Sequence, residues 1–425
     1  MDLKDFALHF NVTAEQQDFI VKYGFNEVAD KLGEVPESLS ESFIRRELAK
    51  LRREHKVEPL LAAAEEIKSD VYTLAYYNYI CYYWWQRPQL TSMLYGNKLP
   101  DITQRPVCVE NAGLYRLLIA LAGFGAVEKS YAGLGLPPEV AADTLQYING
   151  AIDEFATGHD GKYGVNPNKL QWMRFYVDGK LFRVGRLEFM IQDPLPYLPA
   201  AYRRKSDGKV IALCRSGWQL DKDGMMLYPD EGLSKLYITA QISKVNNTIT
   251  GIPLNPAGFA EVDRTITLDL NEYEAVWNNW DLVPGIHIPG GGGMTPEICR
   301  ESLLKAREFF ARYFKREVAG FSCFSWIYNT QFEEELPQSN LADFMRQVYL
   351  FPFPPVGVEG LFFVFGKSPK PHEDWSHYPA DNSLRKAFHR IRESGRRLRA
   401  GGMFIEARGL ENYGKSIYRK EYQNQ

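Results

Sequence analysis

The segment VPGIHIPGGGGMTPE, residues 283–297, joins an apolar, strand-like run to the start of a helix. Its four consecutive glycines, Gly290 to Gly293, let the backbone turn freely and approach a ligand without interference from a Cβ atom. Thr295 suits the N-cap position and Pro296 the first helical position, so free backbone N–H groups point outward at this helix start. With the positive end of the helix dipole, these groups form a candidate site for phosphate or pyrophosphate.

The glycine segment also has a simpler interpretation. The glycines then form only a flexible connection, and Thr295 and Pro296 form an ordinary helix cap. Glu297 in the first turn suits the same dipole and would repel a phosphate placed very close. The segment lacks the Gly-Lys-Ser/Thr of a P-loop, and no G-x-G-x-x-G opens an early βαβ unit, which disfavours nucleoside triphosphates and NAD.

The rest of the second half alternates between strand-like and helical patterns. Apolar periodicity and capping residues predict strands over 283–288, 318–326, 361–365 and 403–407, with helices over 295–314, 341–349 and 382–393. Short β-like runs separated by turn residues precede them, over 181–191, 210–214, 236–242 and 264–268. Meander strands followed by alternating helices and strands predict a mixed sheet flanked by helices.

The first part of the chain reads as consecutive helices. Thr13 with Gln16 and Ser38 with Glu41 have the spacing of capping boxes. Apolar residues recur every three or four positions over 43–51, 60–85, 110–131 and 138–155. A polar, glycine-containing stretch over 157–164 then marks a boundary, so we expect a helical domain over 1–157 and a sheet domain over 158–425. The predicted fold class is α+β.

Composition excludes several classes of protein. The 425 residues include 45% hydrophobic and 24% charged residues, as in an ordinary globular protein. A formal net charge of -3 gives no overall reason to bind nucleic acid, and no apolar run suits a membrane span. We expect a cytoplasmic protein, because the N-terminus does not resemble a secretory signal. The 5 cysteines form no C-x-x-C pair, so we expect reduced thiols and no metal site: Cys81, Cys108, Cys214, Cys299 and Cys323.

Several phrases resemble a bacterial family of acyltransferases with a helical N-terminal domain and a GNAT-like C-terminal domain. They are LFRVGRLEF (181–189), GIHIP (285–289), MTPE (294–297), SCFSW (322–326), LPQSN (336–340) and DNSL (381–384). The resemblance implies that pantetheine lies between two splayed central strands, so the strands at 283–288 and 318–326 should be parallel neighbours that diverge near the glycine loop. It also implies acetyl-CoA or another acyl-CoA as co-substrate and a small-molecule acceptor, an amine being expected.

The same resemblance assigns coenzyme A to the loop itself. The residues concerned are Ile288, Gly290, Gly291, Gly292, Gly293, Met294 and Thr295. The usual GNAT pyrophosphate signature begins with Arg or Gln and spaces its glycines, whereas Ile288-Pro289 and an unbroken glycine run stand here. Backbone amides would therefore supply most of the phosphate contacts.

Acyl transfer to an amine needs a base, and two residues are candidates for it. His287 alternates with Ile286 and Ile288, so its side chain points to the other face of the strand, where it can deprotonate an acceptor. A structural histidine is an equal alternative. Glu188 on an early strand is a second candidate base, although pairing with Arg186 or another arginine is the favoured interpretation.

The departing thiolate needs a proton donor, for which Tyr328 is the first candidate and Tyr349 the second. GNAT enzymes frequently use a tyrosine near the following helix as general acid. Both residues also suit simple aromatic packing. Cys323 is assigned a structural role, because direct attack by an amine needs no covalent intermediate.

Two further clusters suit structural roles. The aromatics within residues 72–85 could line an acceptor pocket or stack on a sugar, but core packing is the favoured role. The arginines within residues 390–399 could meet the phosphates of coenzyme A or an acidic partner, but a solvated charged face is favoured. The principal alternative function is a non-catalytic small-molecule binding or sensor protein that keeps the GNAT-like fold. No G-x-S-x-G elbow supports an α/β-hydrolase.

Overall fold

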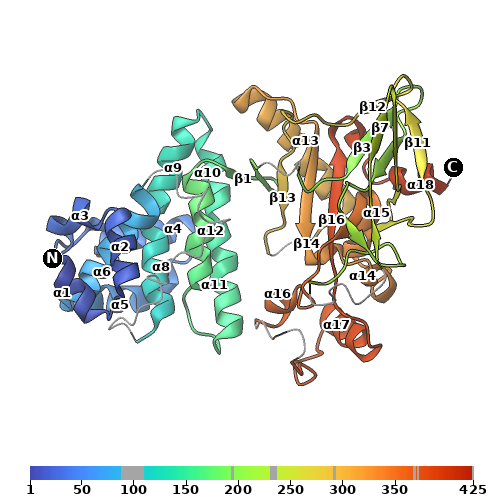
Figure 1. The fold of residues 1–425 in the computed structure, drawn as a ribbon. Helices are drawn as coiled ribbons and strands as arrows, with labels where there is room; N and C mark the ends of the chain where they lie inside the picture. The colour runs from blue at the N-terminus through green and yellow to red at the C-terminus, as the bar shows by residue number, and fades with distance from the viewer. Residues whose placement is uncertain are drawn as a thin grey trace. The chain divides into compact units, whose positions relative to one another are not determined.

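The computed structural model describes residues 1–87, 110–192, 196–229, 237–290, 293–366, 370 and 373–423. The chain divides into two compact units, Met1–Arg183 and Val184–Gln425 (Figure 1). This division lies further along the chain than the boundary expected after residue 157. The reason is an unforeseen helix, α12 (Pro167–Val177), which continues the helical unit beyond the polar stretch.

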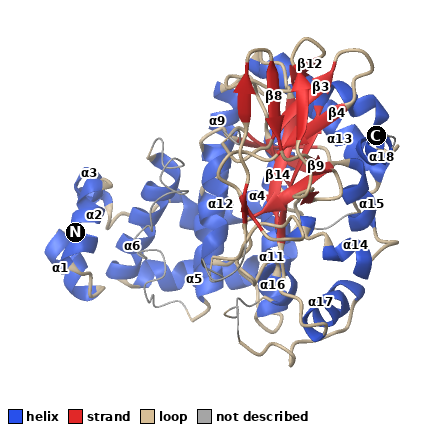
Figure 2. Cartoon of the chain, turned by 45° about the vertical axis from the view of Figure 1, so that its right-hand side comes forward, coloured by secondary structure: helices blue, strands red, loops and turns tan. Residues whose placement is uncertain are grey.

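The first unit is helical, as the sequence predicts (Figure 2). Its longer helices are α1 (Leu3–His9), α2 (Ala14–Lys22), α4 (Glu41–Lys50), α5 (Val57–Ser69), α6 (Val71–Cys81), α8 (Ala112–Ala122), α9 (Phe124–Gly133), α10 (Pro138–Leu145), α11 (Tyr147–Gly158) and α12. The capping box of Thr13 and Gln16 is confirmed at the start of α2. The expected cap at Ser38 is wrong, because Ser38 lies in the 3-10 turn η2 (Glu37–Leu39) and Ser40 caps α4 instead.

The apolar run over 60–85 forms two helices and a turn. Asp70 ends α5 and caps α6, since its carboxylate accepts hydrogen bonds from the backbone N–H and the hydroxyl of Thr73. A π-helical turn, η4 (Tyr82–Gln86), follows α6. Most of the aromatics of this run are buried in the first unit, where the Tyr76 and Tyr115 rings stack with centroids 6.1 Å apart.

A six-stranded mixed sheet of order β1-β2-β13-β14-β16-β15 lies mainly in the second unit. Its strands are β1 (Leu181–Val184), β2 (Leu187–Met190), β13 (Gly285–His287), β14 (Gly320–Ser325), β15 (Tyr349–Phe353) and β16 (Ala400–Glu406), and the division between the units falls within β1. β13 and β14 are parallel, whereas β2, β15 and β16 run antiparallel to their neighbours. The accompanying helices include α13 (Pro296–Phe309), α14 (Gln331–Glu335), α15 (Asn340–Gln347) and α17 (Ser383–Glu393).

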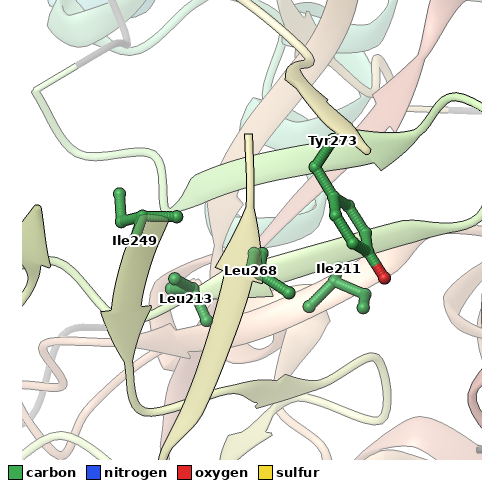
Figure 3. Close-up of a cluster of buried hydrophobic side chains, with 5 residues drawn as sticks. All are labelled: Ile211, Leu213, Ile249, Leu268 and Tyr273. Atoms are coloured by element: carbon green, nitrogen blue, oxygen red, sulfur yellow. The ribbon is translucent and has the colours of Figure 1, made fainter. Parts of the chain in front are cut away.

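Short strands between β2 and β13 form the predicted meander. They are β3 (Ala200–Arg204), β4 (Val210–Leu213), β5 (Gln219–Leu220), β6 (Ile238–Thr239), β7 (Ser243–Val245), β8 (Thr248–Gly251), β9 (Leu254–Asn255), β10 (Phe259–Ala260), β11 (Ile266–Asp269) and β12 (Tyr273–Ala275). Residue 236, where one strand was expected to begin, lies outside the described residues. The meander has its own apolar core, shown in Figure 3: Ile211, Leu213, Ile249, Leu268 and Tyr273.

One element prediction is wrong. The apolar run expected as a strand over 361–365 is a short helix, α16 (Leu361–Phe365). Gly360 and Gly366 bracket it with φ angles of 83° and 73°, in the left-handed region that glycine tolerates and that suits helix ends. The edge strand is β15 instead, which begins at Tyr349, the last residue of the helix expected over 341–349, because the observed helix α15 ends at Gln347.

Candidate active site

The two central strands separate after a short parallel ladder. The backbone N–H of Ala319 donates to the carbonyl of Leu282 at 2.9 Å, and that of Ser322 donates to the carbonyl of Pro284 at 3.1 Å. The last parallel pair in the described chain is Gly285 with Ser322. The predicted parallel pairing of these strands is therefore confirmed.

Beyond that pair, each strand follows a different neighbour. β13 continues against β2 up to the pair of His287 with Glu188. β14 continues against β16 up to the pair of Ser325 with Gly401. The backbones of β13 and β14 thus part at the end of β13 that leads into the glycine loop, as expected. We call this opening the strand split.

Register places two of the candidate residues side by side. His287 and Glu188 are direct partners in an antiparallel pair, so their side chains emerge on the same face, with Cβ atoms about 5 Å apart. Phe404 lies on the same face as His287, because it is in register with Ser322 and, through Ser322, with Gly285. The ring of Trp277, just after β12, lies 5.0 Å from the ring of Phe404, so the meander covers this face. Glu188 is buried, with 2% of its surface exposed.

Tyr328 belongs to the opposite, helix-covered face. It ends the 3-10 turn η8 (Trp326–Tyr328) directly after β14, and its ring stacks on Phe344 of α15 with centroids 6.2 Å apart. Its hydroxyl lies beside the thiol of Cys323. Gly401 allows this approach, because a Cβ atom there would lie 2.3 Å from the carbonyl oxygen of Tyr328. The candidate base and acid therefore lie on opposite faces of the sheet.

Burial sets the protonation state of these groups. It lowers the pKa of His287 to about 4, so the imidazole is neutral at physiological pH and can accept a proton. It raises the pKa of Tyr328 well above that of an ordinary phenol, so this hydroxyl keeps its proton. It raises the pKa of Cys323 to about 12, which leaves a thiol rather than a nucleophilic thiolate.

Tyr349, the second candidate acid, has a structural position. Its hydroxyl donates to the carbonyl of Leu254 at 2.5 Å and lies 3.4 Å from the backbone N–H of Ala212, which donates to it. It therefore ties β15 to the meander on the face away from Tyr328. Its ring stacks on Phe404 at 4.7 Å.

The glycine loop leads from the strand split to α13. Gly291 and Gly292 lie outside the described residues, while Ile288, Gly290, Gly293, Met294 and Thr295 lie within them. The Thr295 hydroxyl caps α13 by accepting from the backbone N–H of Ile298. The carboxylate of Glu297 accepts hydrogen bonds from its own backbone N–H and from the Thr295 hydroxyl. These two bonds, the backbone one more strongly, lower the pKa of Glu297. Glu297 therefore already uses a helix N–H that an anion would bind.

Arg186 is a loop residue that sequence reasoning did not connect with the glycine segment. It lies in the turn between β1 and β2, and its Nε donates to the carbonyl of Gly293 at 3.0 Å. Ser302 of α13 fixes this turn by accepting from the N–H of Leu187 at 3.1 Å and donating to the carbonyl of Val184. The usual signature carries Arg or Gln within the loop, whereas here the hairpin turn supplies a guanidinium from outside it.

The other basic candidates are already paired. Arg390 and Arg396 both hold Glu335 at 2.6 Å, while Arg397 lies over the ring of Tyr228 at 3.8 Å. This run is an ion-pair network, not an open phosphate site. The described residues also bring together no group of three or more side chains suited to a metal ion. Within the described ranges, no helix has the length and apolar character that crossing a membrane requires.

The family model of the GNAT-like C-terminal domain matches residues 181–405, more than half of the chain. A solved acyltransferase in complex with decanoyl-CoA and teicoplanin is 19% identical and has a TM-score of 0.61, covering 96% of this chain and 100% of its own. A mutant acyltransferase in complex with octanoyl-CoA is also 19% identical, with a TM-score of 0.60 and coverages of 96% and 99%. A search of curated proteins found no match.

Proposed function

Since this chain belongs to the family of the GNAT-like C-terminal domain, we propose that it transfers an acyl group from an acyl-CoA to a small-molecule amine. The observation that carries the proposal is the strand split between β13 and β14. Backbone groups that leave the parallel ladder there are available to the two amides of a pantetheine arm. Only a ligand lodged in the split can meet side chains from both faces of the sheet.

The reaction then uses one residue from each face. The acceptor nitrogen attacks the thioester carbonyl carbon, the C–S bond breaks, and the nitrogen loses a proton. His287 takes that proton, and Glu188 beside it stabilises the imidazolium that forms. Tyr328 gives its proton to the departing thiolate of coenzyme A.

The glycine loop and α13 hold the pyrophosphate in this arrangement. The N-terminus of α13 supplies backbone N–H groups and its dipole, and Arg186 supplies a positive charge next to Gly293. Glu297 must release its own N–H when phosphate binds. We place the reaction in the cytoplasm, because the four described cysteines are free thiols, as in a reducing compartment.

Titration of thermal stability with acyl-CoAs tests the proposal. Acetyl-CoA, octanoyl-CoA and decanoyl-CoA should raise the melting temperature increasingly with concentration, since a ligand of the native state stabilises it. Octanoyl-CoA and decanoyl-CoA are the donors to try first, because similar solved acyltransferases carry them. No shift with any of the three would contradict the proposal.

A non-catalytic acyl-CoA-binding protein is the second candidate. The low pKa of His287 favours it, because an imidazole of pKa about 4 is a weak base. Release of free CoA thiol in the presence of an amine mixture separates the two functions. Binding without any thiol release would support the second candidate.

A further inference from the structure

We propose that the helical unit contains a separate binding site for an anionic amphiphile, a molecule with an apolar chain and a carboxylate or phosphate head. The site consists of two adjoining cavities that lie wholly within the first unit. It shares no residue with the strand split, so it does not depend on the acyl-transfer proposal.

The first cavity is basic. It has a volume of about 470 Å³ and lies at η4, α9 and the end of α12. Its one carboxylate, Asp178, forms an ion pair with Arg174, whose side chain is almost fully buried. Lys129 and Lys180 are exposed, and neither pairs with a carboxylate in the described part of the chain. Two ammonium groups therefore remain to receive an anion.

Arg174 is held rigidly at this cavity. Its Nη atoms donate to the carbonyls of Trp84 and Arg87 as well as to Asp178. It therefore closes the C-terminal end of η4, next to Trp85, which lines the cavity. This network neutralises Asp178 internally, so the cavity keeps its excess of positive charge.

The second cavity is larger and has a mixed lining, in which apolar side chains stand beside polar and charged ones such as Lys31, Glu34 and Asn78. Its volume is about 730 Å³, and its lining includes Leu32, Pro36, Phe43 and Tyr82. Both volumes fall in the range typical of small-molecule sites, roughly 300–1,000 Å³. Four residues line both cavities, so the two adjoin along α9 and η4: Trp85, Gln86, Ala126 and Lys129.

Charge and shape together select the occupant. The lysines favour an anion over a cation, and the apolar part of the second cavity's lining favours a hydrocarbon chain over a fully polar ligand. A head at Lys129 and Lys180 places the chain past Ala126, where the side chain is only a methyl group. A molecule with both parts fills both cavities at once.

Isothermal titration of the full chain, with saturating CoA present, tests the site. Decanoate and decyl phosphate are the two anionic probes, and decyltrimethylammonium is the probe of opposite charge. At least one anion should bind with a stoichiometry of one, while the cation should not bind. The stronger of the two anions identifies the head group.

Two variants locate the binding. Lys129→Glu should weaken anion binding at least tenfold by charge reversal, and Ala126→Phe should weaken it by filling the junction of the cavities. Lys162→Glu changes an exposed lysine outside both cavities, so this variant should bind the anions as the wild type does. Circular dichroism checks that each variant is folded.

The proposal is overturned if neither anion binds, if the cation binds equally well, or if Lys129→Glu binds as the wild type does. If Ala126→Phe unfolds, anion binding by the Lys129→Glu variant still tests the proposal, because Lys129 is exposed. A Tyr328→Phe variant must bind the anions normally, because the site lies outside the acyl-transfer residues. Failure of acyl-CoA to bind would leave this site untouched.

Discussion

Strand β14 pairs with β16 along its whole length, from Gly320 to Ser325, but its ladder with β13 ends at Ser322. The complete edge is sealed by close packing, since Gly401 and Gly402 leave room for Tyr328 and Phe351. The incomplete edge opens where the chain leads into a glycine loop and a helix start. One strand thus carries a fully paired edge and an open edge, and changes at each should have different consequences.

The largest effect should come from the sealed edge. In Gly401→Ala the new methyl group would lie 2.3 Å from the backbone carbonyl of Tyr328, which cannot move aside as a flexible side chain would. We expect a loss of about 3 kcal/mol in the free energy of unfolding, measured by urea denaturation. Gly150→Ala is the control, because nothing lies within 4 Å of a Cβ there. Equal stability of the two variants would contradict the packing argument.

In contrast to Gly401→Ala, Tyr328→Phe should impair chemistry but not stability. Loss of the proton donor should lower kcat about 10²- to 10³-fold, with little change in acyl-CoA affinity. The free energy of unfolding should change by less than about 1 kcal/mol, because this hydroxyl lies beside the thiol of Cys323, which is a weak acceptor. CoA release by thiol detection is the measurement, and a wild-type rate would remove Tyr328 from the mechanism.

His287→Ala should lower kcat about 10²-fold, at the lower end of the range for general bases. Because the pKa of His287 is about 4, the wild-type rate should rise with pH through about 4 as the imidazole becomes neutral. An inflection of kcat/KM near 6.5 that disappears in the variant would contradict the burial of this group.

The lowered pKa of His287 also affects the stability of the folded chain. The pKa of His287 is about 4 in the folded chain against an ordinary value of 6.5, so the unfolded chain binds the proton more readily. Stability should therefore fall as pH drops from 6.5 towards 4, and His287→Ala should lack this part of the fall. Urea denaturation at several pH values measures the difference.

Arg186→Ala should weaken acyl-CoA binding about tenfold, because it removes one charge-assisted contact next to Gly293. The rate at saturating acyl-CoA should change little, which separates this residue from His287 and Tyr328. Arg186→Lys should restore part of the affinity. Titration calorimetry checks both variants, and unchanged affinity in Arg186→Ala would exclude a role at the phosphate.

The smallest effect is a gain. Glu297→Gln removes a negative charge that is hydrogen-bonded to a backbone N–H at the start of α13. Acyl-CoA should therefore bind about two- to fivefold more tightly. Calorimetry at low salt is the measurement. Weaker binding would mean that the carboxylate assists the ligand.

The local structure at the open edge could be predicted because its signals are local. Glycines, the Thr295 cap and Pro296 lie within a few residues of one another, and alternation along one strand places His287 opposite Ile286 and Ile288. Capping and alternation are short-range effects, so they can be read without the fold. The family resemblance supplied the parallel pairing.

The contacts that the sequence did not predict join distant segments of the chain. Arg186 and Gly293 are 107 positions apart, and Arg390 meets Glu335 across 55 positions. The run at 361–365 was misread because five apolar residues fit a buried strand or a buried helix equally well. That Tyr328 and His287 lie on opposite faces follows only from the register of β13, β14 and β16.

Amide hydrogen exchange tests the role of the strand split most directly. Peptides covering residues 285–290 and 320–326 should be followed with and without decanoyl-CoA. We expect added protection in both peptides, because the pantetheine arm would pair with backbone groups that β13 and β14 do not offer each other. Tight binding of decanoyl-CoA without added protection in either peptide would contradict it.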